Sequence, residues 1–217
     1  MATVERKTPA TAEQRIVIHG VSWDTYLSLS NCSGTGPVQL AYDQGMLEIM
    51  APSYYHELMS QFIGRLVGIL TEELGMGIRS GGSTTMRSEW SRRGAEADQI
   101  YHIRRAAAVR GRREFDPTLP PDLAIEVDLT ASSSSRLPIY STLGIPEIWR
   151  YDGERLTILG RADDGEYRPI DESLSFPKLT AVELEPYLAE YDDSDENDLV
   201  RKFRQWVRDS LRPESTS

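Results

Sequence analysis

Apolar and polar residues recur along the chain in patterns that predict strands and helices in mixed order. The strongest helical pattern follows Ser53, a favourable N-cap residue, and carries an apolar stripe through residues 54–74. Gly75 then stands where a glycine commonly ends a helix. The tripeptide Asp-Gln-Gly at 43–45 separates two short apolar runs and predicts a β-hairpin.

The same reading assigns most of the chain. The predicted strands are residues 16–21, 38–42, 46–50, 76–79, 84–89, 98–103, 122–129, 147–152 and 155–160. The predicted helices are residues 23–30, 54–74, 132–143 (limited by Pro138), 181–191 and a last amphipathic helix beyond residue 198. This order predicts an α/β or α+β fold in which helices flank a central mixed β-sheet.

Chain length allows a single domain, because 217 residues can bury a sizeable core. We expect a loose N-terminal leader at 1–14, the domain proper at 15–191, and an acidic linker with the amphipathic helix at 192–217. The composition, 39% hydrophobic and 27% charged, is typical of a globular protein. Charged residues interrupt every apolar run before ~18 residues, so no membrane span is predicted. The beginning of the chain has no apolar signal segment and Cys32 is the single cysteine, so we expect a cytoplasmic protein without an internal disulfide.

The net charge of −10 disfavours nonspecific binding to DNA, which depends on positive charge. It leaves room for a local basic surface, and residues 104–113 are rich in arginine. That cluster could contact a DNA backbone, and a solvated loop or a subunit contact explains it equally well. Lysine occurs at Lys7, Lys178 and Lys202 alone, so a long central part of the chain has none.

Residues 121–129 carry the most informative pattern, which reads PDLAIEVDL. Side chains of a strand alternate between its faces, so the apolar residues share one face while Asp122, Glu126 and Asp128 share the other. Crowded carboxylates raise one another's pKa and favour a compensating cation. Oxygen ligands of this kind suit Mg²⁺ or Mn²⁺. A sheet with one solvated face is the alternative interpretation.

Asp98 begins the predicted strand at 98–103 and could face Glu126 across the sheet. Two carboxylates on neighbouring strands form a minimal platform for a divalent metal that hydrolyses phosphodiesters. An aspartate at this position is also common in turns, so the pattern alone leaves both readings open.

Several blocks of sequence resemble the Uma2 family of endonucleases within the PD-(D/E)XK nuclease superfamily. They span about residues 20–190 and, although each alone has low specificity, they occur in the family's order and spacing. The blocks are WDTYL at 23–27, GMLEIMAPS at 45–53 followed by His56-Glu57, EAD at 96–98, PDLAIEV at 121–127, and PIY at 138–140 through GIPEIW at 144–149. The resemblance implies a restriction-endonuclease-like fold and a metal-dependent nuclease that cuts DNA.

Matching residues imply roles within that site. Asp98 and Glu126 match the metal-binding acids, the carbonyl of Val127 matches a further ligand, and Glu57 matches a helix position that supports the metal through water. The metal implied is Mg²⁺ or Mn²⁺, and analogy with nucleases that cut both strands implies a homodimer. The C-terminal helix is a candidate contact for such a dimer.

One departure from the family pattern concerns the catalytic lysine. Its usual position, two residues after the acid, is Asp128, and the alternative position is Arg136. Arginine can clamp a phosphate but exchanges a proton poorly with water. Three hypotheses therefore remain: a metal-dependent DNA endonuclease in which Arg136 holds the phosphate, a catalytically impaired relative that serves in binding or assembly, and a hydrolase of another substrate.

Overall fold

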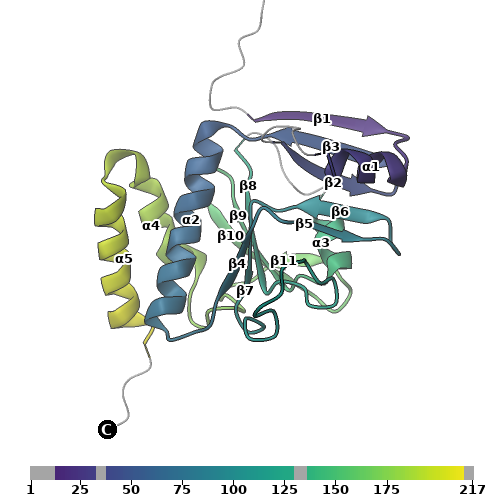
Figure 1. Ribbon diagram of the computed structural model, residues 1–217. Helices are drawn as coiled ribbons and strands as arrows, with labels where there is room; N and C mark the ends of the chain where they lie inside the picture. Colours follow the sequence, from purple (N-terminus) through teal and green to yellow (C-terminus); the bar gives the residue numbers. More distant parts are fainter. Residues whose placement is uncertain (1–12, 33–37, 130–135, 213–217) are drawn as a thin grey trace, which may run out of the picture.

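Two β-sheets and five α-helices make up the part of the chain that the computed structural model describes, residues 13–32, 38–129 and 136–212 (Figure 1). The predicted mixture of helices with a mixed sheet is confirmed, and a second sheet accompanies it. Most of the predicted leader at 1–14 and the start of the predicted helix at 132–143 lie outside the described residues. None of the described helices is sufficiently long and apolar to span a membrane.

The first sheet is antiparallel throughout and has the strand order β1-β3-β2-β6-β5. Its strands are β1 (Gln14–His19), β2 (Gln39–Asp43), β3 (Met46–Ala51), β5 (Thr85–Ser88) and β6 (Arg93–Glu96). The predicted hairpin at 43–45 joins β2 to β3, and its turn needs positive φ angles at Gln44 (46°) and Gly45 (110°).

The second sheet has the order β11-β10-β9-β8-β7-β4 and is mixed, because β8 and β9 are parallel and the other neighbours are antiparallel. Its strands are β4 (Arg79–Gly82), β7 (Gln99–His102), β8 (Leu123–Val127), β9 (Glu147–Tyr151), β10 (Leu156–Arg161) and β11 (Tyr167–Pro169). A parallel pair needs a crossover, and α3 (Leu137–Leu143) lies between β8 and β9 in the chain.

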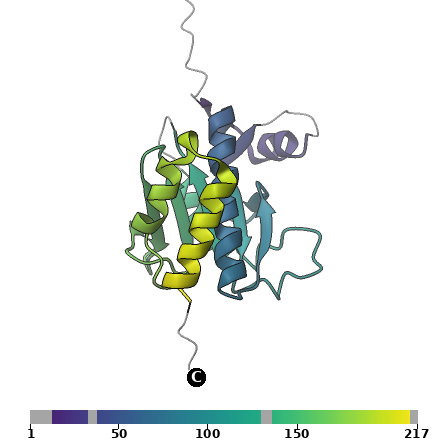
Figure 2. The same ribbon diagram turned by 90° about the vertical axis from the view of Figure 1, so that its left-hand side faces the viewer.

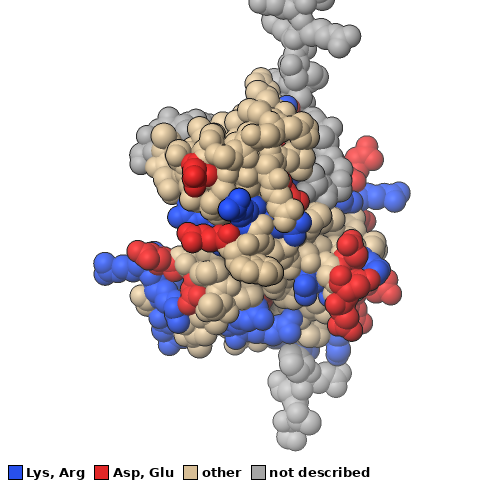
Figure 3. Space-filling view, turned by 90° about the vertical axis from the view of Figure 1, so that its right-hand side faces the viewer, with Lys and Arg blue, Asp and Glu red and all other residues tan. Residues whose placement is uncertain are grey.

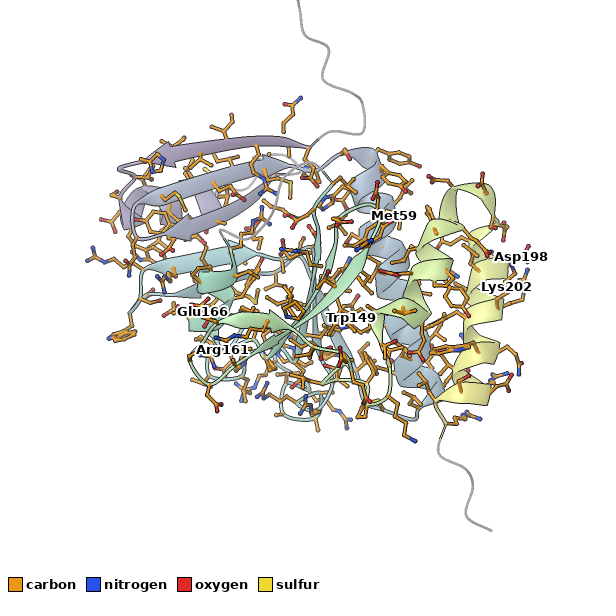
Figure 4. All side chains as sticks on the ribbon, turned by 180° about the vertical axis from the view of Figure 1, so that it is seen from behind. Met59, Trp149, Arg161, Glu166, Asp198 and Lys202 are labelled. Atoms are coloured by element: carbon orange, nitrogen blue, oxygen red, sulfur yellow. The ribbon has the colours of Figure 1, made fainter. Side chains whose placement is uncertain are left out.

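Helices cover both faces of the second sheet. One face packs against α2 (Tyr54–Glu73), whose N-cap Ser53 accepts a hydrogen bond from the His56 amide as its type predicts. Figure 2 shows α5 (Glu196–Ser210) alongside α2, with α4 (Ala181–Ala189) beside them. Trp149 of β9 is fully buried between the sheet and these helices (Figure 4). The remaining helix, α1 (Trp23–Ser30), packs on the first sheet.

The other face of the second sheet meets α3 and the first sheet. Ala124 and Ile148 from the second sheet share one apolar core with Ile139 of α3 and Ala95 of β6. The alternation predicted for β8 is confirmed, since Leu123, Ile125 and Val127 lie in the core beneath α2 and Ala124 lies in this second core. The alternative of one solvated face is wrong, because every residue of β8 is buried.

Local packing explains the main differences from the predicted elements. No strand was predicted between residues 89 and 98, but the chain turns at 89–92 and a further strand, β6, begins at Arg93. Gly94 serves close packing, because a Cβ there would lie 2.2 Å from the Tyr26 hydroxyl. The strand predicted at 76–79 begins at Arg79, since the Gly75 and Met76 amides still bond to carbonyls at the end of α2.

The C-terminal helix begins inside the expected acidic linker, where Asp195 caps it by accepting the amides of Asn197 and Asp198. Its apolar residues Leu199 and Phe203 are buried in the core shared with α2. Arg204 and Arg208 bind Glu73 at the end of α2, with nearest distances of 2.6 and 2.7 Å. The face considered for a dimer contact is therefore packed within its own chain.

Candidate functional site

Asp98 lies at the centre of a buried polar cluster between the two sheets. It directly precedes β7, and the β7–β8 register, which pairs Gln99 with Ile125, continues to place Asp98 beside Glu126. Its Oδ1 accepts hydrogen bonds from Gln39 Nε2 at 2.6 Å and from His56 Nε2 at 2.8 Å, and its Oδ2 accepts the Val127 amide at 2.6 Å. Burial alone would raise the pKa of Asp98, but these hydrogen bonds and the charge of His56 hold it below its usual value.

His56 joins Asp98 to a second carboxylate. It stands in the first turn of α2, and its Nδ1 lies 2.8 Å from Oε1 of Glu13. Burial favours the neutral ring, but the two carboxylates outweigh burial and raise the pKa of His56 to about 10. The imidazole is therefore charged and donates both N–H groups, and Glu13 also accepts the Leu129 amide at 3.2 Å.

Glu126 is buried on β8 and is held by a neutral and a charged donor. The Tyr140 hydroxyl donates to Oε1, and Arg136 Nη1 donates to Oε2 at 3.2 Å. Burial raises the pKa of Glu126 to about 8, and the nearby charges of Asp98 and Asp128 add to that rise, while Arg136 and Tyr140 oppose it. Burial is the main cause of this rise, and the two neighbouring carboxylates add to it.

Arg136 is the main cation beside Glu126 and is 1% exposed. Its Nε donates to Glu48 Oε1 at 2.8 Å, and its Nη1 also donates to Gln39 Oε1 at 3.3 Å. Both partners come from the face of β2 and β3 that points toward the second sheet, so Arg136 links the sheets. Burial alone would lower its pKa, but Glu126, Tyr140, Glu48 and Asp98 keep that pKa well above the usual value.

The third guanidinium nitrogen of Arg136, Nη2, differs from the other two. Among the described residues, Arg136 Nη2 is buried and has no hydrogen-bond partner. A buried donor without a partner costs about 1–3 kcal/mol, so native proteins normally pair it with protein, water or a ligand. This nitrogen is therefore positioned to receive an acceptor, such as an oxygen of a bound anion.

The three carboxylates expected along β8 do not form one group. Asp122 turns to another part of the molecule, where it accepts the Ile103 and Arg105 amides and binds the Arg105 guanidinium at 3.0 Å. Asp128, at the position where a lysine is usual, lies 3.7 Å from Arg15. Of the three, Glu126 accepts the hydrogen bond from Arg136, and Asp128 acts on Glu126 through its charge.

Glu57 lies outside this hydrogen-bonded cluster. Its exposed side chain lines a cavity of about 360 Å³ together with Asp98, Gln39 and Ser60. The cavity gives Asp98 contact with the surface, although the carboxylate itself is 4% exposed. The structure thus brings Asp98, Glu126, Val127 and Arg136 together and places Glu57 at the entrance.

The donors in the cluster fit a small divalent cation in part. Among the described residues, no three side chains of His, Cys, Asp or Glu are arranged to hold a metal ion. Mg²⁺, however, commonly uses one or two carboxylates and completes its coordination with water and substrate phosphate. A carboxylate has about four acceptor positions. Asp98 uses three of them and Glu126 uses two, so Asp98 keeps room for about one more bond and Glu126 for about two.

Several residues of the cluster were not predicted from the sequence pattern. They are Glu13, Gln39, Glu48 and Tyr140. Gln39 and Glu48 gave one usable signal, since each is a polar residue inside an otherwise apolar strand of a predicted hairpin. Glu13 fell within the expected leader, yet it is buried and the chain enters β1 immediately after it.

Comparison with known proteins shows the family to which this chain belongs. The model of the Uma2 family, described as "Putative restriction endonuclease", matches residues 23–194. A crystal structure from Anabaena variabilis ATCC 29413, described as a "putative nuclease belonging to DUF820", is similar at 14% identity and a TM-score of 0.49, over 84% of this chain and 99% of its own. No protein with a curated description matches. Because the family model spans most of the sequence, including Asp98, Glu126 and Arg136, the chain belongs to the Uma2 family.

Proposed function

We propose that this protein is a Mg²⁺- or Mn²⁺-dependent endonuclease that hydrolyses phosphodiester bonds in DNA, built on a restriction-endonuclease-like fold. The observation that carries the proposal is the convergence of Asp98, Glu126 and Arg136, which come from three different segments of the chain, in one polar cluster. Membership of a family described as restriction endonucleases supports the same conclusion.

In this proposal, Asp98 and Glu126 hold the divalent ion, with the Val127 carbonyl as a further ligand. The ion supplies Lewis-acid activation of the phosphoryl group and of the attacking water. The Glu57 carboxylate, at the mouth of the cavity, supports the ion through water and meets the incoming substrate. His56 fixes the Asp98 carboxylate through a charged hydrogen bond and is itself fixed by Glu13.

Arg136 takes the phosphate-binding role in place of lysine. Its Nε and Nη1 are occupied by Glu48, Gln39 and Glu126, which fix the plane of the guanidinium. Nη2 keeps its donors for a non-bridging phosphate oxygen, where the fixed positive charge stabilises the charge that develops in the transition state. Arginine does not deliver or remove the proton, so that transfer falls to water.

The experiment compares the native protein, Glu126→Gln and Arg136→Lys on supercoiled plasmid with Mg²⁺ and with Mn²⁺. Nicking or linearisation by the native protein is expected, with loss of at least about 100-fold in Glu126→Gln because a metal ligand is removed. Asp163→Asn serves as the control and should cleave normally, because Asp163 is an exposed acid in the turn between β10 and β11. Calorimetric titration with Mn²⁺ gives an independent readout, and Glu126→Gln should lose that binding as well.

A second function, binding without cleavage, is favoured by one observation. Arg136 is deeply buried and already paired with two acids, as a purely structural residue would be. In that case no protein of the series cuts DNA with either metal, and Mn²⁺ produces no heat. Cleavage that survives in Glu126→Gln would instead contradict the assignment of the site.

A further inference from the structure

An exposed tryptophan marks one end of a surface that the candidate site does not use. Trp90 lies in the turn between β5 and β6 and is 95% exposed. It borders a cavity of about 650 Å³ that Phe115 and Arg87 also line. Tryptophan is enriched among the residues that dominate binding interfaces, so its position beside a cavity makes Trp90 a candidate recognition residue.

This cavity connects with the candidate site through a second one. A hollow of about 260 Å³ shares Phe115 with the first cavity and is lined by Arg79 and Arg113. Ser80 of β4 borders both this hollow and the cavity that contains Asp98. β4 is an edge strand of the second sheet. Three neighbouring hollows, each sharing a lining residue with the next, thus form a route from Asp98 to Trp90.

The charge along this route differs from that of the whole molecule. Arg79 and Arg113 are exposed and, among the described residues, neither has a hydrogen bond or ion pair, while Arg87 bonds to the neutral side chains of Ser30 and Asn31. Figure 3 shows Lys and Arg side chains gathered on the lower part of the face that includes the tip of this hairpin. Three acids, Glu89, Glu114 and Asp116, line the same two cavities, and Asp116 is paired with Arg112, so the positive charge is modest in a protein whose net charge is −10.

We infer that this route binds a single-stranded segment of DNA, with phosphates on Arg79, Arg87 and Arg113 and a base stacked on Trp90. A base inside a duplex has both faces covered by its neighbours, so a stacking partner at the end of a groove selects an unpaired base. Stacking on an aromatic ring together with a row of arginines is the usual chemistry of single-strand binding. The inference rests on the proposed function, since it supplies that site with a substrate that has an unpaired region.

Glycines support close approach at the edge of β4. Residues 80–84 read SGGST, and they offer a strip of small side chains between the Asp98 cavity and the arginines. Gly81 packs against Ile100, where a Cβ would lie 2.7 Å from Cγ1. A nucleic-acid backbone can therefore cross the strand there without meeting a bulky side chain.

The test is fluorescence anisotropy of a labelled 20-nucleotide oligo-dT in EDTA, in competition with a duplex of equal length. The native protein should prefer the single strand, and Trp90→Ala should weaken binding by about tenfold, while Trp90→Phe keeps most of it. Arg79→Ser/Arg113→Ser should weaken binding by a similar factor at low salt and flatten its dependence on salt concentration.

Matched controls exclude general effects on the surface. Tyr54→Ala removes another exposed aromatic residue, and Arg201→Ser removes an exposed arginine on α5; both should bind like the native protein. Absence of binding by the native protein, equal binding by Trp90→Ala, or preference for the duplex would overturn the inference. Because binding is measured without metal, the two proposals can fail separately. Single-strand binding without any plasmid cleavage would contradict only the proposed function. Plasmid cleavage together with unchanged oligo-dT binding by Trp90→Ala would contradict only the inference.

Discussion

At the scale of single residues, the site is an alternating arrangement of buried acids and cations. Asp98 is compensated by charged His56, and Glu126 is compensated by Arg136. Breaking such a buried pair leaves one charge without a partner in a poorly solvated place, which is more harmful than removing both. The polar cluster should therefore show strong coupling between its members.

The pair of Arg136 and Glu126 tests this coupling. At about pH 9, where Glu126 is ionised although its pKa is raised to about 8, Arg136→Met should lower the free energy of unfolding by about 3–5 kcal/mol, because Glu126 and Glu48 lose their cation. Adding Glu126→Gln should recover part of that loss, since the amide removes one of the uncompensated charges. Urea denaturation of the two single variants and the double variant measures the coupling. Purely additive changes would show that the two side chains do not act as a pair.

The sequence predicts Asp98 and Glu126 as site residues because each stands in a block that resembles the family, and it predicts Arg136 because this residue lies four positions before Tyr140. It could not identify Glu13 or Tyr140, whose roles arise from packing. Glu13 meets His56 because β1 pairs with β3 and brings the start of the chain beside α2. Contacts of this kind depend on the final arrangement of sheets, which no local pattern contains.

At the scale of elements, periodicity predicted α2, β8, β9 and β10 well, because their apolar residues repeat at the spacing of their own secondary structure. It missed β6, because the small and charged residues of this strand show no apolar alternation. Tyr26 packs against the strand. Periodicity also missed the early start of α5, because a run of acids resembles a linker. Two of those acids, Glu196 and Asp198, lie in the first turn of the helix, where negative charge is favourable.

The contact between α2 and α5 should depend on acid pH. Arg208 and Arg204 bind Glu73 and lower its pKa from 4.5 to about 2. A carboxylate with a lowered pKa stabilises the folded state above its unfolded pKa, and this contribution is lost as the pH falls from about 4.5 toward 2. Melting curves of the native protein and Glu73→Gln should therefore differ most at neutral pH and converge near pH 2. A difference that stays constant over this range would contradict the role given to Glu73.

At the scale of the whole molecule, the two sheets have unequal support. The second sheet lies between α2 and α3 and contributes to both large cores, whereas the first sheet packs on the short helix α1 and on the second core. Arg136 adds a polar connection, because it bonds to Glu48 of β3 and to Glu126 of β8. The homodimer remains a prediction, and within the described residues its suggested contact on α5 is covered by α2.

Hydrogen exchange should resolve this unequal support. Amides of β2 and β3 are expected to exchange faster than those of β8 and β9, since local opening follows the amount of buried apolar surface. Glu48→Gln should speed exchange selectively in β2 and β3 by weakening the connection through Arg136. Equal acceleration in both sheets would indicate that the molecule opens as a single unit instead.

The replacement of lysine by arginine in the site has a practical consequence for labelling. The two lysines that the structure describes, Lys178 and Lys202, are exposed, and Lys202 stands on α5 at the side of the molecule away from the first sheet (Figure 4). Amine-reactive dyes and acetylating reagents therefore have no target among the cluster's described side chains. A chip coupled through Lys202 would hold the molecule by its helical side, with the route from Asp98 to Trp90 left open to solution.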